Sequence, residues 1–97
     1  MAITASLSVS VLGEGTSVGR FVEAALDALA ARGVKHQPGP MATAIEAKDL
    51  ATLFRAVEAA HDAVAKAGAK RIVLHLAIDH RLDKDATLES KVASLRK

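Results

Sequence analysis

The first segment of the chain alternates between apolar and polar side chains. Over residues 3–12 one set of alternate positions is apolar and the other mostly carries hydroxyl groups. A period of two residues is typical of a β-strand that faces a core on one side. A similar alternation predicts a second long strand over residues 70–79. The apolar positions of the two strands that we expect beneath helices are Ile3, Leu7, Val9, Ile72, Leu74 and Leu76.

Two other segments repeat their apolar residues with helical spacing. Residues 18–32 and 50–67 each place an apolar stripe along one side of a helix. Ser17 and Asp49 precede these segments, and each can accept a hydrogen bond from the first helical turn. A glycine follows each segment, which suits the left-handed backbone that often ends a helix. The predicted stripe of the second helix is Leu50, Leu53, Phe54, Val57, Ala60, Val64 and Ala67.

The segment between these helices is short and extended. Pro38-Gly39-Pro40 interrupts it, and a helix cannot continue through that sequence. We predict a strand over residues 34–37, a turn, and a strand over residues 41–46, with one bent strand as the alternative. A last helix is predicted over residues 87–96, with an apolar side formed by Leu88, Val92 and Leu95.

The order of these elements is βαββαβ, followed by a short C-terminal helix. Two helices of this length cover one face of a four-stranded sheet. The sequence therefore predicts an α+β fold of ferredoxin-like type, with an antiparallel sheet and two helices on one face. No linker or low-complexity stretch divides the chain, so we expect residues 1–97 to form one domain.

The sheet face opposite the helices is predicted to carry little charge. Small hydroxyl groups and apolar side chains lose water at low cost, so a second sheet or a small ligand is expected to cover this face. The alternative is an unremarkable face in solvent. The C-terminal helix also needs a partner for its apolar side, and we expect it to pack on a neighbouring subunit. The positions of this open face are Thr4, Ser6, Ser8, Ser10, Val73, His75 and Ala77.

Composition narrows the classes of function. The chain has 97 residues and no cysteine, which excludes disulfides, thiolate zinc sites and cysteine nucleophiles. Its predicted strands contain no aromatic residue on which RNA bases could stack. No apolar run approaches the ~20 residues that span a membrane, and the N-terminus does not resemble a signal peptide. We expect a cytoplasmic protein that binds neither nucleic acid nor membranes.

The polar residues form no catalytic constellation. The four histidines fall on different predicted elements, and His75 with Asp79 provides too few ligands for a metal ion. The sequence from Gly13 to Ser17 lacks dinucleotide and P-loop spacing, so a turn is the simpler interpretation. We expect no enzyme activity, no metal and no cofactor.

Glu46 stands out because it ends a predicted strand that is otherwise free of charge. A carboxylate at that position could hold an aminopyrimidine or a cation through charge-assisted hydrogen bonds. A charge in solvent at the end of the strand is the alternative. If Ile45 packs under the helices, Met41 and Thr43 share its face and Glu46 joins the open face; the reverse register would exchange the faces.

Three segments resemble one known family. PMATAIEA, AHDAVAKAGAKRIV and IDHRLDKDATLESKVAS are similar to the patterns P-M-G-T-x-I-E, a-H-x-a-x-x-x-G-a-x-R-v and I-D-x-R-x-D-K-x-x-T-x-x-x-K-V of the thiamine-binding-protein-like family. The resemblance covers nearly the whole chain without gaps. Ala42 departs from it, because the family often has glycine there. The matching positions are Met41, Thr43, Ile45, Glu46, His61, Arg71, Asp79, Arg81, Asp83, Lys84, Thr87, Lys91 and Val92.

The resemblance implies a ferredoxin-like fold and homo-oligomers, often tetramers, joined through sheets and C-terminal segments. It also implies binding of thiamine, or of its hydroxymethylpyrimidine moiety, without catalysis. We expect Thr43 and Glu46 as polar anchors, with Met41, Ser6, Ser8 and His75 lining the site. The expected oligomer interface comprises Leu88, Val92, Leu95 and Arg81. A regulatory or structural homo-oligomer without a small ligand is the alternative function.

Overall fold

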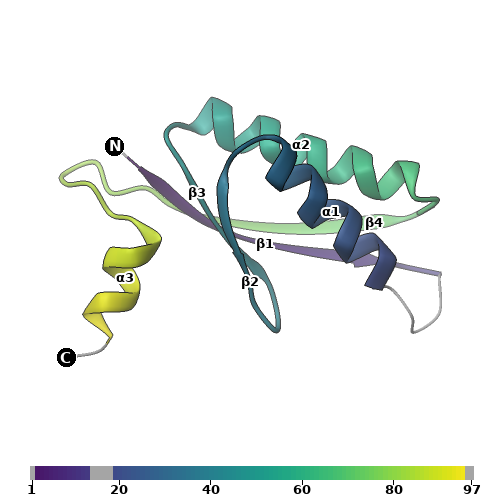
Figure 1. Ribbon diagram of the computed structural model, residues 1–97, viewed down its shortest axis with the longest axis horizontal. Helices are drawn as coiled ribbons and strands as arrows, with labels where there is room; N and C mark the ends of the chain where they lie inside the picture. Colours follow the sequence, from purple (N-terminus) through teal and green to yellow (C-terminus); the bar gives the residue numbers. More distant parts are fainter. Residues whose placement is uncertain (1, 14–18, 96–97) are drawn as a thin grey trace.

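The chain folds into an antiparallel sheet with two helices on one face and a third helix at one end (Figure 1). The computed structural model describes residues 2–13 and 19–95. The four strands have the order β2-β3-β1-β4, which confirms the predicted ferredoxin-like sandwich. The elements are β1 (Ile3–Val11), α1 (Gly19–Ala31), β2 (Lys35–Pro38), β3 (Thr43–Ala47), α2 (Leu50–Lys66), β4 (Ile72–Asp79) and α3 (Leu88–Ser94).

The pairing of β1 with its two neighbours determines which residues share a face. Leu7 lies opposite Thr43 of β3 and opposite Leu76 of β4. Residues directly opposite one another in antiparallel strands point to the same side of the sheet. Ile45 is fully buried in the core on the side of the helices, so its neighbour Glu46 points to the open face. Of the two registers considered from the sequence, the structure has the one in which Ile45 is in the core and Glu46 is on the open face.

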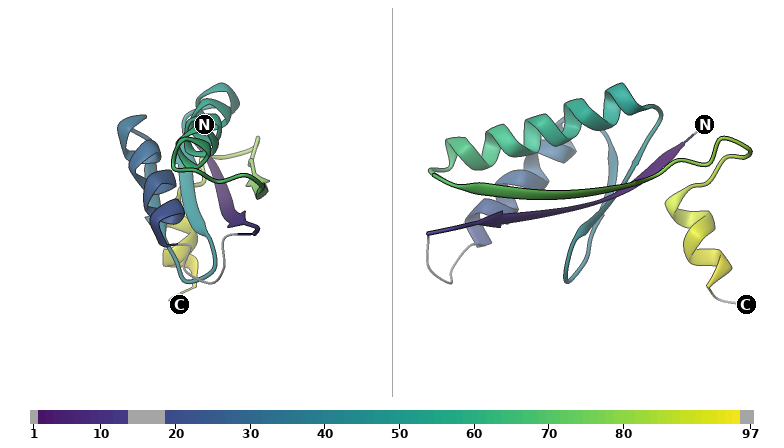
Figure 2. Two further views of the ribbon diagram at one scale, coloured as in Figure 1. Left: turned by 90° about the vertical axis from the view of Figure 1, so that its right-hand side faces the viewer. Right: turned by 180° about the vertical axis from the view of Figure 1, so that it is seen from behind.

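The core lies between the sheet and one side of α1 and α2 (Figure 2). It confirms the predicted helical stripes only in part. Leu50 and Phe54 were expected inside, but they are 42% and 51% exposed. The side of α2 that packs on the sheet instead includes small residues, because alanine allows the helix to approach the sheet closely. Its buried residues are Leu53, Ala56, Ala60 and Val64.

The helix ends largely follow the predicted capping signals. Asp49 Oδ1 accepts a hydrogen bond of 2.7 Å from the backbone N–H of Thr52 at the start of α2. Gly33 and Gly68 have φ values of +72° and +108°, as the left-handed position requires. The expected cap Ser17 lies outside the described residues.

The remaining boundaries differ from the predictions by up to two residues. The N–H of Gly39 donates to the carbonyl of Ala42 over 2.9 Å, which closes a turn between two separate strands. The alternative of one bent strand is wrong. Thr87 caps α3 and does not begin it, because its side chain accepts from the N–H of Ser90 while the Ser90 side chain accepts from Thr87. No helix among residues 2–13 and 19–95 is long and apolar enough to cross a membrane.

The difference between the two leucines of α2 can be measured directly. Leu53 is fully buried and Leu50 is 42% exposed. Leu53→Ala should lower the free energy of unfolding by about 2–5 kcal/mol, since it leaves a cavity. Leu50→Ala should lower it by roughly 1 kcal/mol or less. Urea denaturation of both variants tests the burial pattern, and equal losses would contradict it.

Candidate functional site

One row of residues across the sheet brings together the polar groups of the open face. Thr4 lies opposite Glu46 on one side and opposite Asp79 on the other. Lys35 of β2 extends the same row beyond Glu46. Thr4 is only 4% exposed, although it points away from α1 and α2. Its hydroxyl donates to the backbone carbonyl of Asp79 over 3.3 Å.

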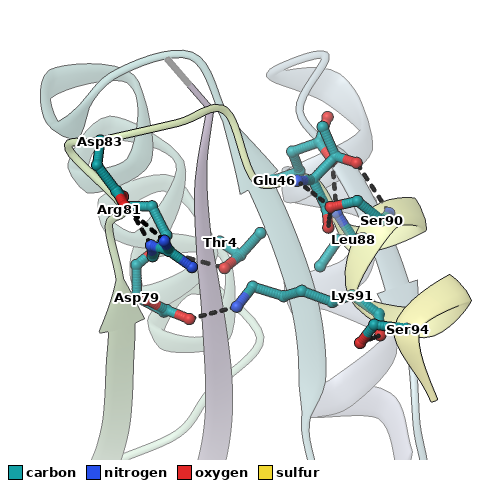
Figure 3. Close-up of polar contacts among 10 residues, drawn as sticks. Thr4, Glu46, Asp79, Arg81, Asp83, Leu88, Ser90, Lys91 and Ser94 are labelled. Carbon is teal, nitrogen blue, oxygen red and sulfur yellow. Dashed lines mark hydrogen bonds and ion pairs between the residues drawn. The ribbon is translucent and has the colours of Figure 1, made fainter.

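The two carboxylates of this row hold α3 against the open face (Figure 3). Glu46 Oε1 accepts a hydrogen bond of 2.9 Å from the backbone N–H of Leu88, in the first turn of the helix. Lys91 extends from α3 across β1 and forms an ion pair with Asp79. We call these two contacts, Glu46–Leu88 and Lys91–Asp79, the α3 joint. Thr4 lies in the row between the two carboxylates of this joint.

The loop between β4 and α3 is braced by local contacts. The guanidinium of Arg81 donates to both carboxylate oxygens of Asp83, over 2.8 and 2.6 Å. This hydrogen bonding lowers the pKa of Asp83 to about 2 and raises the pKa of Arg81. Asp85 accepts a hydrogen bond of 2.6 Å from the backbone N–H of Ala2, and Ala86 is buried. The loop is thereby anchored beside the start of β1.

A hollow of about 290 Å³ lies beside the α3 joint. Its volume is near the lower end of the range for small-molecule pockets. Most of its surface is apolar, while Asp79 and Lys91 supply charge at one side. Hydrogen bonding to Lys91, and then the positive charge of Lys91, hold the pKa of Asp79 below its ordinary value. The lining residues are Thr4, Ala5, Ser6, Ala77, Ile78, Asp79, Leu88 and Lys91.

A second cavity lies on the opposite side of the sheet, between α1 and the turn that joins β2 to β3. Its volume is about 130 Å³, less than half that of the hollow beside α3. Ala42, the departure from the family pattern, lies in its wall. Its lining includes Leu7, Ser8, Val22, Leu26, Pro40, Met41, Ala42 and Thr43.

The six residues predicted to line one ligand site are divided between the two faces of the sheet. Ser6 lines the hollow beside α3, and Glu46 holds that helix in place. Met41 and Thr43 line the second cavity, and Ser8 borders it although its pairing with His75 puts its side chain on the open face. Thr43 and Glu46 are three positions apart on one strand, so their side chains point to opposite faces. The structure therefore does not bring the two expected anchors together.

His75 and the expected interface residues lie elsewhere. His75 is exposed on the open face, opposite Ser8. Val92 and Leu95 are 41% and 84% exposed, whereas Leu88 is half-buried against the chain's own sheet. Within residues 2–13 and 19–95, no group of three or more acidic or histidine side chains could hold a metal ion.

Sequence reasoning missed the contributions of Thr4, Leu88 and Lys91 to this site. Lys91 is separated from Asp79 by twelve positions and a loop, so local periodicity gives no indication of their contact. One signal was available, because Asp79 and Lys91 both belong to the third segment of the family resemblance. Two charges of opposite sign in one such segment are a pattern that could have suggested an ion pair.

Comparison with known proteins decides the family. The family described as "Thiamine-binding protein" matches residues 5–96. The chain belongs to this family. Several positions of the family patterns quoted above contribute to the α3 joint and the adjoining loop, namely Glu46, Asp79, Arg81, Asp83, Thr87 and Lys91.

Relatives and solved structures agree with this assignment. A UPF0045 protein of Methanothermobacter thermautotrophicus is 44% identical over 95 residues, which cover 97% of this chain and 96% of the relative. A hypothetical protein of Methanocaldococcus jannaschii has a crystal structure with a TM-score of 0.90 at 32% identity, covering 98% of this chain and 96% of that one. A Thermotoga maritima protein described as a candidate for thiamine biosynthesis or salvage has a TM-score of 0.85 at 26% identity, covering 99% and 100%.

The Lys91–Asp79 ion pair of the α3 joint predicts a change in the pKa of Asp79 that can be measured. Lys91→Met removes the ammonium group, so the pKa of Asp79 should rise toward its ordinary value of 3.8. NMR titration of the Asp79 carboxyl carbon gives this value directly. Because the fold lowers the pKa, the ion pair stabilises the protein above about pH 4, and this contribution is lost as the pH falls through the folded-state pKa.

Lys70→Met is the matched control for this titration. Lys70 precedes β4 at the end of the strand remote from Asp79. Its loss should leave the pKa of Asp79 unchanged. An Asp79 pKa that is insensitive to Lys91→Met would show that the ion pair does not persist in solution.

Proposed function

We propose that this protein binds thiamine, or its hydroxymethylpyrimidine moiety, without catalysing a reaction. The observation that carries this proposal is the hollow beside α3, with a carboxylate at its margin, in a chain of the thiamine-binding protein family. The description of the Thermotoga maritima relative supports the same class of ligand.

The chemistry of the hollow suits a flat, positively charged ligand. Ala77, Ile78 and Leu88 offer apolar surface to the faces of an aromatic ring. Thiamine carries a permanent positive charge on one ring and an amino group on the other. A carboxylate can attract the charged ring or accept a hydrogen bond from the amino group. Asp79 is the carboxylate that lines the hollow. A bound cation would then take the place of Lys91 beside Asp79.

A binding role, as opposed to catalysis, is supported by the way the polar groups are engaged. Asp79 is paired with Lys91, and the hydroxyl of Thr4 donates to a backbone carbonyl. Neither arrangement provides a nucleophile with a base beside it. We therefore propose that the protein carries or stores its ligand in the cytoplasm.

We further propose that a second copy of the chain covers the rest of the open face, in a homo-oligomer of four subunits. Beyond the hollow this face presents Ser8, Ser10 and His75, and no helix or strand among residues 2–13 and 19–95 forms an opposing layer there. The exposed Val92 and Leu95 of α3 adjoin it and offer apolar surface for a neighbour. An oligomer that fills this face and leaves no room for a ligand is the alternative function.

Calorimetry tests the ligand. Thiamine and hydroxymethylpyrimidine should each release or absorb heat on binding, and Asp79→Asn should weaken thiamine binding by about tenfold through loss of one charge-assisted contact. Asp62→Asn serves as the control, because Asp62 is exposed on α2 and should leave affinity unchanged. Absence of heat at millimolar concentrations of both ligands would rule out the proposed function.

Light scattering tests the assembly. The single chain has a mass of 10.1 kDa, and the proposed oligomer should have four times this mass. Ser8→Lys places a charge in the middle of the open face and should dissociate the oligomer without unfolding the chain. Glu23→Lys, on an exposed position of α1, should not. A wild-type protein that remains monomeric at 100 μM, a concentration chosen to favour association, would contradict this assembly.

A further inference from the structure

Basic side chains gather at the place where α1 ends and α2 begins. Two adjoining hollows lie there, of about 200 and 310 Å³, and both are lined in part by Arg32 and Thr52. Arg55 lines the smaller hollow, and Lys35 and Lys48 line the larger one. Segments far apart in the sequence thus supply four cations to one recessed surface, which we call the basic recess.

The cations of the basic recess make no direct contact with a carboxylate in the part of the chain that the structure describes. Across residues 2–13 and 19–95, none of these four side chains forms an ion pair or a hydrogen bond. Glu46 is the one acidic residue in the lining, and its Oε1 already accepts from Leu88. The chain as a whole has a formal net charge of only +2, so the lining concentrates positive charge in one place.

A neighbouring acid, Asp49, is affected by two of these charges. Asp49 borders the recess and caps α2 through Thr52. That hydrogen bonding is the main reason for the lowered pKa of Asp49, but the charges of Lys48 and Arg55 lower it as well. Both cations therefore act on the same small volume. Asp49 does not line either hollow.

We propose that the basic recess binds a phosphate group, either as free inorganic phosphate or as the end of a small phosphate ester. Two guanidinium groups from different segments can each donate two parallel hydrogen bonds to a phosphate, and the hydroxyl of Thr52 adds a further donor. Lys35 and Lys48 supply additional charge at the margin. A dianion with several acceptor oxygens suits this donor set better than a monovalent carboxylate.

The shape of the recess favours a small ligand over a nucleic acid. The cations are confined to one end of the fold, whereas a bound polynucleotide needs a stripe of positive charge and, when single-stranded, aromatic groups for stacking. Aromatic residues are absent from the lining of both hollows. This site does not depend on thiamine binding, because it lies apart from the residues that line the hollow beside α3.

Phosphate titration followed by amide NMR tests the site. Sodium phosphate added at constant ionic strength and pH 7.5, where inorganic phosphate is a mixture of the monoanion and the dianion, should shift amide signals of residues 31–35 and 47–55. Arg32→Gln and Arg55→Gln should each weaken the apparent affinity about tenfold. Arg71→Gln, an exposed control before β4, should leave it unchanged. Shifts spread over the whole surface, or unaffected by both recess variants, would overturn the proposal.

Further titrations identify the source of the phosphate group. Shifts of the same signals by inorganic phosphate and by thiamine monophosphate, but not by thiamine, would support a phosphate site that also accepts esters. Shifts by inorganic phosphate alone would support a site for the free anion. Tighter binding of a 12-nucleotide RNA through the same residues, with steep salt dependence, would overturn the assignment to a small ligand. Should either arginine variant fail to fold by circular dichroism, Lys35→Gln and Lys48→Gln provide the same test at exposed positions.

Discussion

The antiparallel pairing of β1 with β3 and β4 is the constraint on which the site depends. It places Thr4 between Glu46 and Asp79, with both carboxylates on the face opposite the two long helices. A shift of β3 or β4 by one residue would turn its carboxylate toward the core and separate it from α3. The burial of Ile45 makes such a shift costly, so the packing of the core determines where the charges of the open face lie.

The position of α3 follows from several small contributions acting together. An exposed ion pair such as Lys91–Asp79 stabilises a fold little by itself. It acts beside the hydrogen bond from Leu88 to Glu46 and the capping box of Thr87. Burial of Ala86 fixes the loop that leads into the helix. The hollow is bounded by residues of the sheet and of α3, so its shape depends on all of these contacts.

Local periodicity predicted the elements and their order, because strands and helices repeat their apolar residues at different intervals. It also implied that Glu46 shares the open face once Ile45 was placed in the core. Periodicity wrongly predicted that Phe54 is buried. Which side of α2 faces the sheet depends on how closely the helix approaches it, and the buried side carries Ala56 and Ala60. It could not predict the contact between Lys91 and Asp79, because a loop and twelve positions separate them. Charge counts likewise gave no sign of the basic recess, which exists only where separate chain segments meet.

The α3 joint and the adjoining loop link segments that are synthesised early in translation to segments that are synthesised late. β1 precedes the other strands, yet the hollow that Thr4 lines is bounded by Leu88 and Lys91 from α3, and Asp85 must be present to accept from Ala2. The sheet and both long helices can form from residues that are made before residue 80. The hollow is therefore completed only after the sheet and both long helices have been synthesised. A nascent chain halted after β4 would carry a finished core and two carboxylates that still lack their partners.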